Sequence, residues 1–283
     1  MTPELIQWFT RNEHTYPIRS EADLKKAPIA LRNKLLFKIE GNVEVLAALL
    51  TAGVEVNQQD QHGLTPLHYA AHNGSAECII LLIGAGAKVD ATNHALDTPL
   101  LWAADRYSTL IIILLLAAGA EIDHQNSAEM SALHLAAAKG CLENVKCLIK
   151  PNIHNKPGAD LNLQDHSGWT PLHHAVQNEH LEVVKCLVEN GANLKLTTTN
   201  PAGKYSVKSE TARQIAASFK DTRIYTYLLD QAVKQHLVKI PTFMPSGAPQ
   251  TGPKTQPKPV TIYQEKKATL EPICEQEEQL GYC

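Results

Sequence analysis

Apolar residues recur at helical spacing in five segments of the chain, and the aligned segments lie 33 or 39 residues apart. Within each segment the apolar positions fall at i, i+3 and i+4, a pattern that predicts a helix. A pair of short helices cannot bury such a stripe alone, whereas stacked copies can, so each unit is expected to be stabilised by its neighbours. The three apolar columns are Leu46, Ile79, Ile112, Val145 and Val184; Leu49, Leu82, Leu115, Leu148 and Leu187; and Leu50, Ile83, Leu116, Ile149 and Val188.

A second set of markers repeats in the same register. Thr65-Pro66-Leu67 returns as Thr98-Pro99-Leu100 after 33 residues, as Ser131-Ala132-Leu133 after another 33, and as Thr170-Pro171-Leu172 after 39. The threonine can cap a helix, and proline suits the first helical position, where no N–H is needed. Each unit is therefore predicted to hold a short helix such as "LHYAAHN", a second helix such as "AECIILLIGAG" that ends at a glycine, and a polar loop.

The repeated stretches "DQHGLTPLHYAAHNG", "GAKVD", "SALHLAAAKG", "GADLN" and "DHSGWTPLHHAV" resemble the ankyrin repeat family. The resemblance covers about residues 27 to 240. It implies an all-α solenoid of stacked helix-turn-helix units, in which antiparallel helices pack in rows and hairpin loops project to one side.

The markers also predict the domain boundaries. Residues 1–27 precede the repeats, and "TPELIQWF" is expected to form a capping helix that buries Leu5, Trp8 and Phe9. The extra residues of the 39-residue step fall in "KPNIHNKP", which is interpreted as a loop insertion. The repeat domain is placed at 28–240, with units at 28–59, 60–92, 93–125, 126–164, 165–196 and 197–230 plus a closing helix. The first and last units depart from the motif, as terminal caps with a solvated outer face do.

Residues 241–283 have a different composition. Seven of the 16 prolines fall there, which predicts a disordered linker. The final stretch "EPICEQEEQLGYC", residues 271–283, holds four glutamates and no basic residue. It resembles the glutamate-rich translocation signals of bacterial type IV effectors, although acidic tails are also commonly just solvated.

Bulk properties narrow the function classes. The net charge of −3 over 283 residues gives no reason to expect binding to nucleic acid or to an anionic membrane. The longest apolar run, "LIIILLLAAGA", is far shorter than the roughly 20 residues that span a bilayer. No secretory signal and no CxxC motif is visible, so we expect a soluble cytoplasmic protein in a reducing compartment, with export into a host cytosol as the alternative.

Three histidines share one position in different units: His68, His134 and His173, with Leu101 in the remaining unit. Three imidazoles could suggest a metal site, but they lie one repeat apart, and zinc requires its ligands within about 2.3 Å of one point. The resemblance implies an architectural role instead, in which the ring nitrogens tie the start of the helix to an adjacent loop.

Other chemistry finds little support in the sequence. Cys147 and Cys186 share a column with Ala48, Leu81 and Leu114, which favours a small buried residue over a nucleophile. Neither a phosphate-binding glycine loop nor an HExxH motif is present. We therefore expect no enzyme activity, cofactor or metal; an enzyme with a cryptic Cys/His site is the remote alternative.

Positions that vary between units indicate where partners bind. The resemblance places the variable positions of the first helices and loops on a concave face, and Trp, Tyr and Arg are common in interface hot spots. The alternative is that these are unconstrained solvated positions. The candidate partner-binding residues are Tyr69, His72, Trp102, Asp105, Arg106, Lys139, Trp169, His174, Gln177 and Asn178.

The second helices carry one apolar anomaly. Where other units have a solvent-suited Glu–Lys pair, the third unit has Leu110 and Ile113, next to Ile80 of the second. These residues predict an exposed apolar patch on the convex side, either a second contact surface, a dimer seam or a dock for a tail, or merely tolerated aliphatics.

The sequence as a whole predicts a non-catalytic module that binds partner proteins of unknown identity. A monomer is expected, with a dimer through the convex patch as an alternative. A bacterial effector that is translocated into a host cell would act by the same binding mechanism.

Overall fold

A computed structural model describes residues 2–12, 17–39, 41–106, 108–150, 157–199, 209–219, 221–235 and 237. The chain divides into two compact parts, Met1–Lys239 and Ile240–Cys283. The predicted proline-rich linker and the acidic segment 271–283 lie outside the described residues, as does most of the predicted loop insertion at 150–157.

The described residues of Met1–Lys239 form helices, which confirms the all-α prediction. The β structure among these residues is one isolated antiparallel bridge between Thr197 and Thr211. None of its helices is both long enough and apolar enough to span a bilayer. The helices are α1 Pro3–Asn12, α2 Glu21–Lys26, α3 Ile29–Leu36, α4 Val43–Thr51, α5 Pro66–Asn73, α6 Ala76–Gly84, α7 Pro99–Ala104, α8 Thr109–Ala117, α9 Ala132–Lys139, α10 Leu142–Ile149, α11 Pro171–Gln177, α12 Leu181–Glu189, α13 Ala212–Ala216 and α14 Arg223–Lys234.

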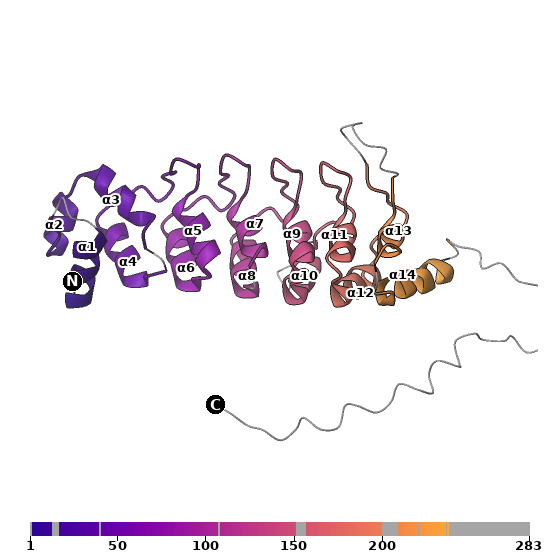
Figure 1. The fold of residues 1–283 in the computed structure, drawn as a ribbon. Helices are drawn as coiled ribbons and strands as arrows, with labels where there is room; N and C mark the ends of the chain where they lie inside the picture. Colours follow the sequence, from indigo (N-terminus) through magenta and orange to yellow (C-terminus); the bar gives the residue numbers. More distant parts are fainter. Residues whose placement is uncertain are drawn as a thin grey trace, which may run out of the picture. The chain divides into compact units, whose positions relative to one another are not determined.

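From α3 onward the helices are arranged in pairs, and the pairs stand side by side with their hairpin loops on one side (Figure 1). We call α3, α5, α7, α9, α11 and α13 the first helices, and their partners α4, α6, α8, α10, α12 and α14 the second helices. From α5 to α13 each first helix packs against the next, and each second helix likewise packs against its successor. The chain therefore stacks as the 33-residue period predicts.

The core lies between the two rows. Both leading apolar columns of the second helices, headed by Leu46 and Leu49, are fully buried in all five units at 0% exposure. The third column is less enclosed, because Leu50, Ile83 and Ile149 are only partly buried. Leu116 of the same column is 1% exposed. Each apolar stripe is buried against its neighbours, so burial couples the units.

The local signals act as the sequence predicts in the consensus units. Thr65 has extended dihedrals (φ −96°, ψ 164°), and Pro66 follows it at the first position of α5. The helix ends at Gly74, whose φ of 69° is left-handed and suits a residue without a Cβ. In the third unit α7 has 6 residues against 8 in α5.

The helices at the two ends of the stack also bury apolar side chains. In α1 the side chains of Leu5 and Phe9 are buried, while Trp8 is partly buried and packs against the core. The Lys38 ammonium donates a hydrogen bond to the carbonyl of Asn12 at 3.0 Å, which ties the end of α1 to the region after α3. In α14 the residues at helical spacing, Ile224, Leu228 and Ala232, are buried.

Candidate functional site

All three histidines of the first helices contact the residue that starts their own helix, and His68 and His134 also reach the neighbouring loop. In the second unit the Thr65 backbone N–H donates to His68 Nδ1 at 3.1 Å, and the Thr65 hydroxyl lies 2.8 Å from the same atom. Because Nδ1 accepts from an N–H, the proton of the ring sits on Nε2, which lies 2.9 Å from the carbonyl of Asp97 in the next hairpin. The histidine thus joins the start of its own helix to the neighbouring unit.

His134 and His173 repeat this arrangement. His134 Nδ1 contacts Ser131, and its Nε2 donates to the carbonyl of Trp169 at 3.1 Å. His173 Nδ1 contacts Thr170 in the same way, although its buried Nε2 has no hydrogen-bond partner within the described residues. Burial lowers the pKa of each imidazole to about 4, so both rings are neutral at physiological pH.

The third unit lacks the histidine, and a buried hydroxyl is left without a partner. Thr98 has the same dihedrals as Thr65 (φ −96°, ψ 164°) and is fully buried. Leu101 occupies the position of the imidazole and is 1% exposed. Among the described residues nothing hydrogen-bonds the Thr98 hydroxyl.

Each hairpin loop is organised by one Asp or Asn side chain. In the loop after the first unit, Asp60 Oδ1 accepts from the backbone N–H groups of His62 and Leu64 at 2.8 and 2.9 Å. Asn93, Asn126 and Asp165 accept equivalent pairs of bonds in the next three loops. These side chains replace sheet ladders as the source of order in the loops.

Backbone hydrogen bonds run from hairpin to hairpin. The N–H of His94 donates to the carbonyl of His62 at 3.0 Å, and the loops that follow repeat the pattern. The repeats are Ser127 to Ala95 at 2.9 Å, His166 to Ala128 at 3.1 Å and Thr199 to Ser167 at 2.9 Å. The hairpins consequently form a continuous, positioned edge.

A side-chain brace stabilises most hairpin tips. Gln59 Nε2 donates to the carbonyls of Gly63 and Thr92 at 2.8 and 2.9 Å, and Gln125 and Gln164 make the corresponding contacts later in the chain. Thr92 occupies the position equivalent to Gln59, Gln125 and Gln164, so the hairpin that contains Leu96 lacks this glutamine. There His124 Nε2 donates to the carbonyl of Leu96 at 2.9 Å instead, so a histidine from the next loop supplies the missing donor.

Two hairpin tips hold side chains in a left-handed conformation. The tip position is Gly63 and Gly168 in two hairpins but Leu96 (φ 61°) and Glu129 (φ 59°) in the two between them. Left-handed backbone costs a residue with a Cβ roughly 1–2 kcal/mol. Leu96 is also 48% exposed, so burial does not compensate for this conformation.

Three of the predicted partner-binding residues in the second and third units, His72, Trp102 and Arg106, form one contiguous group. The rings of His72 and Trp102 lie 5.3 Å apart, and the Arg106 guanidinium contacts His72 Nε2. The Tyr69 hydroxyl donates to Asp60 Oδ2 at 2.8 Å. Burial together with this carboxylate raises the pKa of Tyr69 to about 12.

The charged candidates of the third and fourth units are paired across units. Lys139 Nζ lies 3.2 Å from Asp105 Oδ1, and both side chains remain about half exposed. A pair this exposed contributes little to stability, so both charges stay accessible to a partner.

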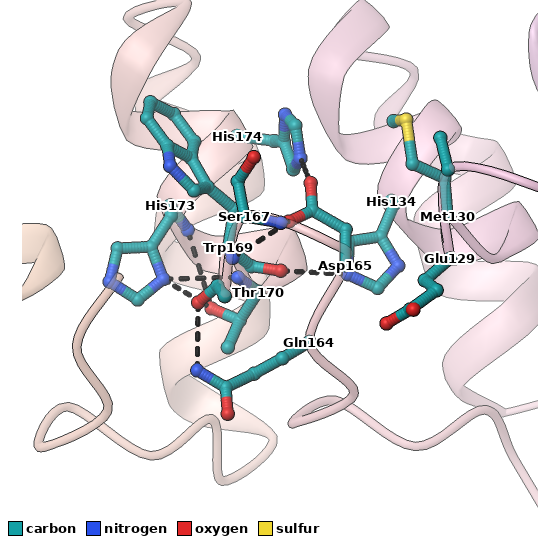
Figure 2. Close-up of polar contacts among 12 residues, drawn as sticks. Glu129, Met130, His134, Gln164, Asp165, Ser167, Trp169, Thr170, His173 and His174 are labelled. Atoms are coloured by element: carbon teal, nitrogen blue, oxygen red, sulfur yellow. Dashed lines mark hydrogen bonds and ion pairs between the residues drawn. The ribbon is translucent and has the colours of Figure 1, made fainter. Parts of the chain in front are cut away.

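A second group surrounds Trp169 and is built around Asp165 (Figure 2). The His174 ring points to the Asp165 carboxylate, and Nε2 donates to Oδ2 at 2.8 Å. Burial opposes the charge on Asp165, but bonds from His174 and from the backbone of Trp169 and Ser167 outweigh it and lower the pKa of the carboxyl. The Trp169 ring lies 5.2 Å from the His174 ring, and the His174 side chain is 18% exposed.

The remaining candidates fall at the ends and on the other row. Gln177 and Asn178 are exposed at the end of α11, where the Asn178 amide donates to the carbonyl of His174 at 2.9 Å. On the second helices Ile80, Leu110 and Ile113 are 57%, 55% and 41% exposed. The structure thus separates the candidates into a first-helix face and an apolar patch on α6 and α8.

The arrangement offers binding groups rather than reactive ones. Within the described residues no three His, Cys, Asp or Glu side chains lie close enough together to hold a metal ion. Cys147 and Cys186 are half-buried, and burial raises the pKa of both thiols, which disfavours the reactive thiolate.

Leu96 and His124 are not among the residues that the sequence pattern singles out. The signal is present when the units are aligned with one another, because Leu96 falls where Gly63 and Gly168 occupy other tips, and His124 falls where a neighbouring loop has Ala91. Their roles become visible only when φ and the contact between the loops are known.

Comparison with known proteins agrees with these features. A family model described as ankyrin repeats (3 copies) matches residues 36–126 and 100–200, which together cover residues 36–200 and hence 165 of 283. An ankyrin repeat protein of fowlpox virus is 48% identical over 54 residues, which is 18% of this chain and 38% of the viral protein. The match thus spans well under half of that relative.

Proposed function

Because this chain belongs to the ankyrin repeat family, whose members are generally protein–protein interaction modules and typically not enzymes, we propose that it binds partner proteins through its first-helix face. This face consists of the outward side chains of α5, α7, α9 and α11 together with the hairpin tips. The observation that carries the proposal is that two aromatic groups, centred on Trp102 and Trp169, lie on this face with polar groups beside them.

The composition of the face fits recognition of a protein. Tryptophan and arginine are over-represented among residues that dominate binding energy, and such residues act best when a rim of polar contacts excludes water. Here Arg106, Lys139 and Gln177 are exposed on the same row of first helices, while the rings of Trp102 and Trp169 are partly buried. Hydrogen bonds between hairpins hold the edge in place, so a partner would meet a preorganised surface.

The test begins with the intact chain as bait and identification of the captured proteins by mass spectrometry. Affinity for the purified partner is then measured by calorimetry for wild type, Trp102→Ala with Arg106→Ala, and Trp169→Ala. Each variant is expected to lose about thirtyfold or more in affinity, since hot-spot truncations cost about 2 kcal/mol or more.

Arg223→Ala is the matched control, because this arginine is 74% exposed on α14 and pairs with Asp221. It should bind like the wild type. Circular dichroism must show that every variant stays folded. Wild-type affinity in both tryptophan variants would refute the first-helix face as the binding surface.

A further inference from the structure

The second helix of the last pair, α14, ends differently from the second helices before it (Figure 1). In the earlier units a glycine follows the second helix, and its equivalent here is Ala232, 41 residues after Gly191. Ala232 lies inside α14, which has 12 residues against 9 in α12. At the end of α14 the N–H of Leu237 donates to the carbonyl of Ala232 at 2.8 Å. In the unit before, Ala192 makes this contact with Leu187 at 3.0 Å, so α14 is longer by about one turn.

The extra turn removes a contact that joins each earlier hairpin to the next. At the base of the first hairpin, Asn57 Oδ1 accepts from the backbone N–H of Lys88 at 2.8 Å. Equivalent side chains accept the same bond at the next three bases, namely Asp90, Asp123 and Asn162. In the last unit the acceptor is replaced by Lys195, and the equivalent of the donor is Lys234 inside α14. The described chain after α14 supplies no further hairpin to cover this side of the stack.

A cavity of about 240 Å³ lies at this end of the stack. Its apolar lining consists of Leu194, Leu228, Ala232 and Leu237. Lys195 and Arg213 line it as well, and no acidic residue is among the described residues around it. Neither cation forms an ion pair with another described residue. Two positive charges beside an apolar cavity suit a ligand that joins a negative charge to an apolar group.

We propose that this cavity binds a carboxylic acid with a short alkyl chain, the chain in the cavity and the carboxylate at Lys195 and Arg213. A guanidinium can bind a carboxylate through two parallel N–H···O bonds, and an ammonium adds a compact point charge. The volume sets the length of the chain. At about 30 Å³ for each heavy atom, the share of a water molecule in the liquid, the cavity holds about eight atoms. Octanoate is therefore the best-fitting member of the series.

Burial of the chain sets the expected affinity. Each methylene that leaves water favours binding by roughly fourfold, and ordering of the chain and loss of free motion oppose it. We expect a dissociation constant of about 0.1–1 mM for octanoate. Hexanoate, which is two methylenes shorter, should bind about tenfold more weakly. Dodecanoate should gain no more than about twofold over octanoate, because its extra methylenes lie outside the cavity.

The experiment is isothermal titration calorimetry of the full chain with these three acids and with octan-1-ol. The alcohol has the same chain length without the charge, so it should bind at least about tenfold more weakly than octanoate. Arg213→Gln and Lys195→Gln should each weaken octanoate by about threefold to tenfold. Arg223→Gln is the matched control, because this arginine is 74% exposed on α14 and does not line the cavity, so it should bind like wild type.

A cavity-filling variant separates this site from other apolar surfaces. Ala232→Leu keeps a strong helix former and places a larger side chain in the cavity, so it should weaken octanoate by about tenfold or more. The double variant Leu110→Glu with Ile113→Lys removes exposed apolar side chains from α8 and should bind octanoate like wild type. Circular dichroism must show that each variant stays folded.

Three results would overturn the site. The first is the absence of saturable octanoate binding by the wild type up to about 10 mM, about tenfold above the expected range. The second is equal affinity for octanoate and octan-1-ol. The third is binding that survives in Ala232→Leu but is lost in the Leu110/Ile113 variant. These outcomes do not depend on partner binding at the first-helix face, so the two proposals fail separately.

Discussion

Two buried threonines at equivalent positions provide a matched test of what the histidine network contributes. Thr65 and Thr98 share the dihedrals −96° and 164° at the start of α5 and α7, and both are at most 3% exposed. The hydroxyl of Thr65 bonds His68, whereas that of Thr98 has no partner within the described residues. Replacement of each by valine exchanges a hydroxyl for a methyl group and leaves shape and backbone preference nearly unchanged.

The two replacements should act in opposite directions. Thr65→Val removes a buried hydrogen bond at the helix start, which costs about 1 kcal/mol of the free energy of unfolding. Thr98→Val removes a buried hydroxyl that makes no bond, which relieves a desolvation penalty of about 1 kcal/mol or more. The expected difference between the variants is therefore about 2 kcal/mol.

Urea denaturation followed by circular dichroism measures this difference. With a slope of about 3 kcal/mol per molar urea, the two midpoints should lie about 0.7 M apart, with that of Thr98→Val above wild type. A double-mutant cycle sharpens the test: in the background Leu101→His, which supplies a ring to accept from Thr98, the Thr98→Val change should become destabilising. Equal losses of stability in the two single variants would refute this account of the third unit.

Three further predictions follow from other parts of the chain. Leu96→Gly and Glu129→Gly should each raise the free energy of unfolding by about 0.5–1 kcal/mol in urea, because glycine relieves the left-handed strain, whereas Ala95→Gly, at a tip residue without positive φ, should not. His134 keeps its pKa near 4 when folded but titrates near 6.5 when unfolded, so the unfolded state binds more protons and stability should fall by roughly 3 kcal/mol per such histidine between about pH 6.5 and pH 4. His134→Gln copies the Thr211–Gln214 contact at 3.0 Å and should make the melting temperature fall less between about pH 6.5 and about pH 4 than it does in the wild type. An unchanged pH dependence of the melting temperature would contradict a neutral, buried His134. If residues 271–283 direct type IV export, deleting them should abolish translocation of a fused reporter, and undiminished translocation would count against the signal.

The stack could be predicted because its determinants are periodic. Apolar columns such as the one headed by Leu46 specify burial, and the Thr-Pro-Leu markers specify where first helices begin, without reference to distant contacts. The architectural role of the histidines also follows once the repeat is recognised. These features are periodic because equivalent positions in every unit pack against equivalent positions of the neighbouring units.

What the sequence could not predict are side-chain contacts outside the repeated apolar and capping positions. The sequence makes His174 a candidate for partner contact, yet the structure places its ring against Asp165 and Trp169 of its own unit. Asn144 falls in an apolar column with Ile111, yet it is 1% exposed and satisfied from another unit. Both depend on distances in the folded chain, within one unit for His174 and across units for Asn144, that a one-dimensional pattern does not encode.

The third unit shows why these irregular contacts belong together. It departs from the repeat at Leu96 and Leu101 and, directly before its first residue, at Thr92, and α7 within it is short. Two side chains further along the chain compensate: His124, at the end of the same unit, donates to the Leu96 carbonyl, and Asn144 of the fourth unit accepts from the Thr109 hydroxyl and donates to the carbonyl of Ala104 at the end of α7. A stack in which stability is shared can tolerate a unit with weak local signals, because interfaces with its neighbours hold it in place. The third unit is consequently free to carry side chains suited to contact on both rows, Trp102 on the first and Leu110 on the second.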